Sequence, residues 1–219
     1  MSSANSSAPV ADMTVVGGAG HVGVPLVLAF THAGLTVNIN DLNQQSIATL
    51  KSGKLPFIEY DAEPLLKDAL ARNRLVFSSS PAGISAPGPV IVTIGTPVDE
   101  FFNPVQQAVQ ACIDSLLPHM VDGQLLILRS TVYPGTTTWV DEYLKRVGRN
   151  IKVAFCPERI VQGYGVKELR EMPQIVSGTT PEAEREAAAL FAKLAPEIVT
   201  VKPLEAEFAK LFNNAYRYI

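Results

Sequence analysis

The sequence predicts an α/β fold in which a doubly wound parallel sheet carries helices on both faces. Apolar runs of strand length alternate with stretches of helical spacing from residue 13 onward. Runs such as 89–95 are apolar along their length, as strands buried on both faces of a parallel sheet are. A glycine-rich turn joins the first run to the first helix. With 219 residues, 47% of them hydrophobic, the chain suits one large domain, or one domain plus the start of another.

Each expected element follows from its pattern. Gly53 ends the second helix, and Asn103 with Pro104 opens the fourth. The last stretch has helical spacing but neither a glycine stop nor a proline after it, so we expect it to begin a long connecting helix. In order, we expect strand 13–17, helix 21–33, strand 36–41, helix 43–53, loop 54–60, helix 61–73, strands 74–79 and 89–95, helix 103–120, strand 123–131, helix 136–147, strand 151–156, a long loop, strand 174–178, helix 181–194, strand 197–201 and helix 203–219.

Composition and charge exclude several classes of protein. The formal net charge of −3 comes without basic patches, so a nucleic-acid binder is not expected. No apolar run approaches the roughly 20 residues that cross a bilayer, and residues 1–12 have the polar character of a flexible tail rather than of a signal peptide. Cys112 and Cys156 give neither a disulfide framework nor a zinc spacing, and we expect no metal. A cytoplasmic protein is the expectation.

The glycine-rich turn has the G-x-G-x-x-G spacing at Gly18, Gly20 and Gly23. The first glycine permits a tight turn, the second lets the backbone approach a pyrophosphate, and the third lets the helix lie close to the strand. The amides of His21 and Val22 would then face the phosphates at the helix N-terminus. Because this turn lies between a strand and a helix, it indicates a Rossmann-like dinucleotide site rather than a plain structural turn.

Asp41 ends the second expected strand, 18 residues after Gly23. A carboxylate there accepts hydrogen bonds from an adenosine ribose and repels a 2′-phosphate. No Lys or Arg follows before Lys51, so NAD is favoured over NADP as the cofactor. The alternative is that Asp41 only caps the following helix.

Four further motifs follow in order along the chain: "VTIGTPVDE" (92–100), "LRSTVYPGTT" (128–137), "FCPERIVQG" (155–163) and "AEFAKLFNNAYRYI" (206–219). With the glycine turn, they resemble the UDP-glucose/GDP-mannose dehydrogenase family of nucleotide-sugar 6-dehydrogenases. "CPER" and the "KELREMPQIVSG" after it are most similar to the UDP-N-acetylmannosamine dehydrogenase branch. The resemblance runs from residue 13 to the end of the chain. It implies a role in polysaccharide biosynthesis.

The resemblance implies oxidation of a CH2OH group to a carboxylate, with two NAD molecules reduced and a cysteine that captures the intermediate aldehyde. Thr96 and Thr131 would lie near the nicotinamide, and Glu158 would act in acid/base chemistry and thioester hydrolysis. The alternatives are that the two threonines simply end strands, and that Glu158 forms a salt bridge with Arg159 or Lys167.

The same resemblance places Arg159 and Ile160 in the loop that holds the sugar nucleotide. Lys210 would stabilise a developing oxyanion, and Asn214, one turn later, would be a second donor to the same oxygen. Arg217 would continue this row towards a substrate phosphate or carboxylate. The alternative is that Lys210 and Arg217 lie on a solvated helix face.

The chain departs from the family pattern in several ways. Nothing in it matches the family's nucleophilic cysteine: Cys112 is expected in the core, and Cys156 has no such role in the family. Gln162 stands where much of the UDP-glucose branch has an acidic residue. We therefore expect the cofactor-binding half of a longer enzyme, without the second domain, that binds NAD without turnover and is a homodimer at full length. The alternatives are a UDP-glucose or UDP-N-acetylglucosamine enzyme, a non-catalytic NAD-binding module, and a 3-hydroxyacyl-CoA or 6-phosphogluconate dehydrogenase.

Overall fold

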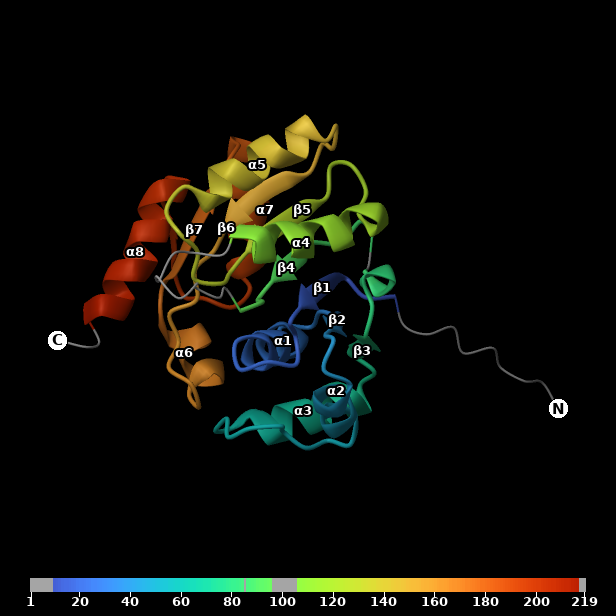
Figure 1. Ribbon diagram of the computed structural model, residues 1–219. Coiled ribbons are helices and arrows are strands. Elements are labelled where there is room, and N and C mark those ends of the chain that lie inside the picture. Colours follow the sequence, from blue (N-terminus) through green and yellow to red (C-terminus); the bar gives the residue numbers. More distant parts are fainter. Residues whose placement is uncertain (1–9, 85, 96–105, 217–219) are drawn as a thin grey trace.

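The computed structural model describes residues 10–84, 86–95 and 106–216, and it has the predicted α/β fold (Figure 1). Within these residues, eight strands form one sheet in the order β3-β2-β1-β4-β5-β6-β7-β8. The strands are β1 (Met13–Val16), β2 (Val37–Asn40), β3 (Leu75–Ser78), β4 (Val90–Val92), β5 (Leu125–Leu128), β6 (Lys152–Phe155), β7 (Gln174–Gly178) and β8 (Ile198–Thr200).

Helices cover both faces of this sheet, and each face has its own apolar core. One core includes side chains of α1 (Gly23–His32), α2 (Gln44–Lys51), α3 (Ala62–Ala71), α6 (Gly165–Glu171) and α7 (Pro181–Phe191). The other includes side chains of α4 (Gln106–Leu116), α5 (Thr136–Arg146) and α8 (Pro203–Tyr216). Figure 1 shows α1, α2 and α3 on one side of the strands, with α4 and α5 on the other.

The central strands contribute to both cores because successive side chains of a strand point to opposite faces. Leu125 and Ile127 of β5 belong to the first core, whereas Leu126 and Leu128 belong to the second. All four are buried, which explains why the run 125–128 is apolar without alternation.

The order of the strands produces a switch point at β1. The chain runs outward from β1 through β2 to β3, then returns to form β4 on the other side of β1. In β1, Val15 pairs with Ile39 of β2 on one side and with Ile91 of β4 on the other. In open α/β sheets, ligands bind at the carboxyl ends of the strands beside such a switch point.

Two features differ from the sequence expectation. β7 is antiparallel to β6, and β8 follows the direction of β7, so the sheet is mostly rather than wholly parallel. The run "QIVSG" has the same pattern in either direction, so sequence alone does not distinguish them. The expected long loop after 156 also contains α6, whose seven residues are too few to show a clear helical period. Residues 1–9 of the expected tail lie outside the described residues.

Two short 3-10 turns, Pro81–Gly83 and Leu117–His119, complete the described chain. None of the helices in the described ranges has both the length and the apolar character needed to cross a bilayer.

Candidate functional site: a glycine turn, a buried ion pair and a lysine helix

The glycine turn follows β1 and lies at the switch point. Gly17 adopts a left-handed conformation with φ of +76°, and its amide donates to the carbonyl of Asn40 in β2 at 2.8 Å. This corrects the sequence expectation, which gave the tight turn to Gly18. Gly18 is required for a different reason, because a Cβ there would lie 2.7 Å from the carbonyl oxygen of Val15.

The other two glycines have opposite surroundings. A Cβ on Gly23 would lie 2.4 Å from the oxygen of Gly17 and 2.6 Å from the Cα of Gly18, so the start of α1 lies directly against the turn. A Cβ on Gly20 would meet only the oxygen of Gly17, at 3.4 Å. Gly23 therefore allows close helix packing, whereas Gly20 borders open space that a ligand can approach.

Two amides at the start of α1 have no partner in the described part of the chain: those of His21 and Val22. Unpaired N–H groups at a helix N-terminus, together with the helix dipole, form a site that suits a phosphate. The imidazole of His21 packs against the ring of Phe57 in a tilted arrangement, with ring centroids 3.9 Å apart. The ring is thus in contact with an aromatic side chain, and the prediction that the main-chain amide of His21 faces a phosphate stays a prediction.

Asp41 follows β2 and joins the turn to the next helix. Its Oδ2 accepts from the amide of Ala19 at 3.0 Å, and its Oδ1 accepts from the amide of Asn43 at 2.9 Å. Asn43, not Asp41, caps α2, by accepting from the amide of Ser46 at 3.0 Å. The alternative that Asp41 is a helix cap is therefore wrong.

A cavity of about 590 Å³ opens beside Gly20 and Asp41. Its walls come from the glycine turn, the end of β2, the end of β4 and α4, where Cys112 and Ser115 contribute. Thr93, directly after β4, supports this wall, because its hydroxyl donates to the carbonyl of Val16 at 2.8 Å. Both the volume and the mixture of apolar walls with a few polar groups are typical of a small-molecule site.

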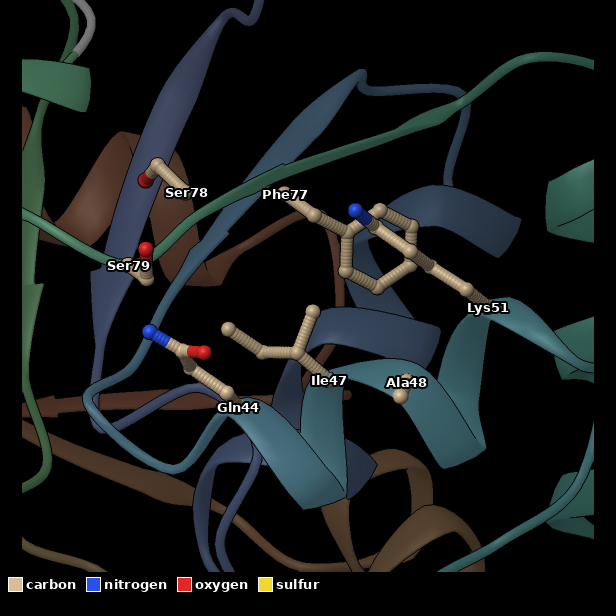
Figure 2. Close-up of a pocket in the computed structure, with 7 residues that line it drawn as sticks. All are labelled: Gln44, Ile47, Ala48, Lys51, Phe77, Ser78 and Ser79. Atoms are coloured by element: carbon tan, nitrogen blue, oxygen red, sulfur yellow. The ribbon is translucent and has the colours of Figure 1, made fainter.

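A second cavity, of about 290 Å³, lies between α2 and the end of β3 (Figure 2). Gln44, Ser78 and Ser79 lie together on one side of it, and Lys51 extends across the ring of Phe77 on the other. The Nζ of Lys51 is 5.4 Å from the centroid of that ring. Lys51, the first basic residue after Asp41 in the sequence, thus lies over an aromatic ring at the C-terminal end of α2.

Glu158 follows β6 and forms a buried ion pair that the sequence did not reveal. Its Oε2 lies 2.8 Å from Nη2 of Arg129, which follows β5, and Arg129 is 1% exposed. The Nη1 of Arg129 donates to the carbonyl of Cys156 and to Oε1 of Gln174, both at 3.1 Å. The expected alternative partner of Glu158, Arg159, instead donates to the carbonyl of Pro173.

The loop that begins at Glu158 is held by its own backbone amides. The amide of Ile160 donates to Oε1 of Glu158, and that of Val161 donates to Oε2 of Glu168 at 2.6 Å. The amide of Gly163 donates to Oε2 of Glu59 at 3.0 Å. Because three carboxylates hold consecutive parts of this loop, Arg159 and Ile160 are presented on a fixed backbone.

Glu59 is the most distant of these carboxylates, and it was missed because it lies in an expected loop. It is 5% exposed, and its Oε1 accepts from the amide of Val166 in the first turn of α6 at 3.1 Å. α6 in turn lies against α1, where a Cβ on Gly165 would be 2.8 Å from the Cβ of Pro25. The loop containing Glu59 therefore connects the helix of the glycine turn with the loop that carries Glu158.

Lys210 and Asn214 lie on α8, one turn apart, as predicted. Lys210 is only 8% exposed, so it is not part of a solvated face, and Asn214 is half-buried. Glu207, one turn before Lys210, is 1% exposed and accepts from the amides of Gly135 and Thr137 at the start of α5. The buried side of α8 is therefore polar where it meets α5.

Three predicted residues remain to be placed. Thr131 is half-buried in the connection between β5 and α5. Thr96 and Arg217 lie outside the described residues. Among the described residues, no group of three or more His, Cys, Asp or Glu side chains could hold a metal ion.

Comparison with known proteins gives the family. The NAD-binding domain of the UDP-glucose/GDP-mannose dehydrogenase family matches residues 11–195. This chain belongs to that family. A UDP-N-acetyl-D-mannosamine dehydrogenase of Methanococcus aeolicus is 28% identical over 205 residues, which are 91% of this chain and 46% of the relative. The enzyme of the same name from Escherichia coli K12 is also 28% identical, over 91% of this chain and 50% of the relative.

The fold agrees with a solved member. The structure of a UDP-D-ManNAc dehydrogenase from Pyrococcus horikoshii superimposes with a TM-score of 0.86 and 26% identity, covering 94% of this chain and 50% of the other. The chain spans about half the length of the curated relatives it matches. NAD is the cofactor of the matched domain.

The two cysteines of this family member are poor nucleophiles. Burial raises the pKa of Cys156 to about 12, although nearby Arg129 and a backbone hydrogen bond from Ser177 lower it in part. Burial likewise raises the pKa of Cys112 to about 11. Cys112, expected in the core, is only partly buried: it packs against the edge of the core and also lines the larger cavity. At neutral pH both are neutral thiols.

Sequence reasoning missed several residues that support the site: Gly17, Glu59, Thr93, Arg129 and Glu207. Each acts through a backbone group or a distant partner, so no local pattern shows the contact. Two gave a usable signal. Arg129 comes directly after the apolar run of a strand, and Glu207 lies between Ala206 and Phe208 in a helical stretch. A charged residue among apolar neighbours is expected to have a partner.

Proposed function

We propose that this chain is the NAD-binding half of an enzyme that oxidises the C6 hydroxymethyl group of a nucleotide sugar to a carboxylate, with UDP-N-acetylmannosamine as the substrate. Family membership supports the reaction class, and the names of the two similar relatives support the sugar. In this proposal the enzyme is cytoplasmic, its second half supplies the nucleophilic cysteine and the rest of the substrate pocket, and the full protein is a homodimer.

The cofactor fits the residues at the glycine turn. The unpartnered amides of His21 and Val22 would bind the pyrophosphate above Gly20, and the Asp41 carboxylate would accept from the adenosine ribose. The cavity beside them would hold the adenosine half, and Thr96 and Thr131 would flank the nicotinamide end. NAD, when bound, supplies the hydride acceptor.

The observation that carries the proposal is the burial of Lys210 on α8. A lysine that is 8% exposed loses hydration, so it is retained where an anion is to be stabilised rather than for solubility. With Asn214 one turn later, its ammonium would bind the oxygen of the reacting carbon as that oxygen gains charge, and could hold the proton it releases. Arg217 would bind a substrate phosphate or carboxylate further along the helix.

Glu158 would carry out acid/base chemistry at the start of the loop that three carboxylates hold in place. Both of its oxygens are already bonded, one to Arg129 and one to the amide of Ile160. Each carboxylate oxygen keeps a second lone pair, so Glu158 would take a proton from water in thioester hydrolysis while these bonds hold it in place. Arg159 and Ile160, beside it, would contact the sugar nucleotide.

Two assays test this proposal. The chain is titrated with NAD and then with NADP, and we expect tighter binding of NAD. NADH formation is then measured with UDP-N-acetylmannosamine, UDP-glucose, UDP-N-acetylglucosamine, an acyl-CoA and 6-phosphogluconate, for the chain alone and for the natural gene product that contains it. We expect no steady turnover by the chain alone, and turnover of UDP-N-acetylmannosamine by the gene product.

The outcomes separate the alternatives. Steady turnover by the 219-residue chain would refute the assignment as a cofactor-binding half. A gene product that binds NAD but oxidises no substrate would favour the non-catalytic module. Activity on the acyl-CoA or on phosphogluconate alone would overturn the reaction class, and preference for UDP-glucose would overturn only the sugar.

A further inference from the structure

The helix α5 begins without a cap of its own. Its N-cap position is Gly135, which has φ of +93° and no side chain to accept from the first amides of the helix. Such amides cost free energy when they are buried without a partner, and Thr136 and Thr137 in the first turn are both buried. The amide of Thr136 donates to the carbonyl of Tyr133 at 3.0 Å, so the amides of Gly135 and Thr137 are the ones that need an acceptor from elsewhere in the chain.

Glu207 of α8 is that group. Its Oε2 accepts from the amide of Gly135 at 2.6 Å, and its Oε1 accepts from the amide of Thr137 at 2.8 Å and from the hydroxyl of Thr137 at 2.6 Å. A carboxylate is also the favoured charge at a helix N-terminus. Because Glu207 is 1% exposed, these three bonds form away from competing water.

These bonds fix how α8 is rotated about its axis. The buried residues of α8 are Ala206, Glu207 and Lys210, on one side of the helix. On other sides, Leu204, Phe208 and Phe212 are exposed and give the helix no comparable contact within the described residues. Lys210 lies three residues after Glu207, on the same face. Holding the Glu207 carboxylate therefore also sets the direction of the Lys210 side chain.

The bonds also set where Lys210 lies along the sheet. Gly135 ends the connection from β5 to α5, and Thr137 lies in the first turn of α5. Thr131 is in the same connection as Gly135. Glu207 thus joins the helix of Lys210 to the segment of Thr131, two residues that are 79 positions apart in sequence. Sequence-local interactions cannot provide this link.

We propose that Glu207 is a positioning residue that fixes the Lys210 ammonium relative to the β5–α5 connection. Its importance for turnover rests on the function proposed above, whereas its effect on the placement of Lys210 does not. A mere helix cap would stabilise α5 and leave the reactivity of Lys210 unchanged.

The first test measures how fast an acetylating reagent modifies individual lysines, read by peptide mass spectrometry. Glu207→Gln keeps the shape of the side chain but replaces one acceptor oxygen with a donor, which cannot accept from the amides of α5. We expect the modification rate of Lys210 to rise at least about tenfold, a loss of protection that corresponds to about 1.4 kcal/mol. Lys152, half-buried in β6 beside Glu186, is the internal reference and should not change.

Matched variants separate the bond from the charge and from folding. Glu205→Gln removes a negative charge from the exposed first turn of the same helix, and we expect it to leave Lys210 protected. Thr137→Val deletes one of the three bonds, whereas Thr137→Ser keeps the hydroxyl. We expect the valine variant to raise the rate several-fold and the serine variant to restore it, which also serves if Glu207→Gln fails to fold.

The second test uses fluorescence and kinetics. Trp139, the one tryptophan of the chain, lies in the first turns of α5, so its emission should shift in Glu207→Gln but not in Glu205→Gln. NAD affinity should be unchanged, because the glycine turn is on another element. In the natural gene product, kcat should fall about 100-fold with an unchanged KM for NAD, as expected for a misplaced reacting group.

The results decide the two proposals separately. If Lys210 stays protected in Glu207→Gln, or if Lys152 loses protection equally, Glu207 is not a positioning residue. If Lys210 is released but kcat is unchanged, Glu207 positions Lys210 without importance for the reaction, and the catalytic part of the inference fails. If wild type binds NAD and oxidises no nucleotide sugar, the proposed function fails, whereas lysine modification still decides the placement of Lys210.

Discussion

The buried pair of Arg129 and Glu158 gives the sharpest stability prediction. Arg129→Met removes the charge and keeps an apolar stem of similar length in the same space. It leaves the Glu158 carboxylate, 5% exposed, with the Ile160 amide as its partner, and leaves the Cys156 carbonyl and the Gln174 side chain without the Arg129 donor. Glu158→Gln is the reciprocal change, and the double variant completes the cycle.

The magnitude follows from the burial of both partners. Removing one member of a buried ion pair costs about 3–5 kcal/mol, because the other charge stays desolvated. The Nε of Arg129 is buried without a hydrogen-bond partner in the described chain, so Met relieves part of that cost, and we expect about 4 kcal/mol. Glu158→Gln keeps one acceptor and should cost about 2–3 kcal/mol. The double variant should cost about 4 kcal/mol, which gives a coupling energy of about 2–3 kcal/mol.

Urea unfolding followed by circular dichroism measures these values. With a urea m-value of about 3 kcal/mol/M for a chain of this size, Arg129→Met should move the midpoint down by roughly 1–2 M. The control is Lys67→Met, which breaks the exposed Lys67–Glu63 pair and should leave the midpoint almost unchanged. The m-value itself should be the same in all variants.

Additivity of the two single changes within about 0.5 kcal/mol would contradict the buried ion pair, because independent sites add in this way. An Arg129→Met variant that is no more destabilised than Lys67→Met would contradict it too. Either result would mean that the two charges are solvated in solution, and that Arg129 does not hold Glu158 in place.

Four further predictions concern the nucleotide site and the thiols. Gly23→Ala should destabilise the fold by about 1–3 kcal/mol, because the added Cβ clashes with the glycine turn. Gly20→Ala should have the melting temperature of wild type and bind NAD about tenfold more weakly. Equal melting temperatures of the two variants would contradict this contrast. Asp41→Asn should lower the preference for NAD over NADP by about tenfold in paired titrations, and an unchanged ratio would remove Asp41 from the ribose site. Cys156 and Cys112, whose pKa values are raised to about 12 and about 11, should resist alkylation in the folded chain at pH 8; fast labelling of either would count against it. Because the pKa values of both thiols are raised above the ordinary 9.0, the folded state binds more protons than the unfolded state above pH 9. The stability that the buried thiols contribute is therefore complete below pH 9 and is lost as the pH rises towards 12. Cys156→Ala should reduce that loss, measured by urea unfolding at several pH values.

Much of the fold followed from local pattern. The strands β1, β5 and β7 and the helices α1, α5 and α7 lie within the predicted ranges, because a long apolar period depends on burial that the whole fold must satisfy. α6 was missed because seven residues give two turns at most. The direction of β7 was missed because a strand's side-chain pattern is the same whichever way its neighbour runs.

The candidate site divides in the same way. The spacing of Gly18, Gly20 and Gly23 is local, since a turn that lets a helix follow a strand closely requires small residues at fixed intervals. In the structure, a Cβ on Gly18 or Gly23 would come within 3 Å of backbone atoms. The i, i+4 spacing of Lys210 and Asn214 is likewise a property of any helix. What these residues bind and catalyse remains a prediction.

By itself, the sequence determined the class of fold, the location of the dinucleotide turn and the face of α8 that carries Lys210, because each depends on residues a few positions apart. Only the tertiary structure decided that Arg129 pairs with Glu158, that Glu59 reaches α6 and that Glu207 caps α5. These contacts join residues that are 29, 107 and 70 positions apart, and each satisfies a buried charge with a distant backbone or side-chain group. A buried carboxylate must find a partner, but which one it finds depends on how the strands and helices are arranged in space, and neighbouring residues do not encode that arrangement.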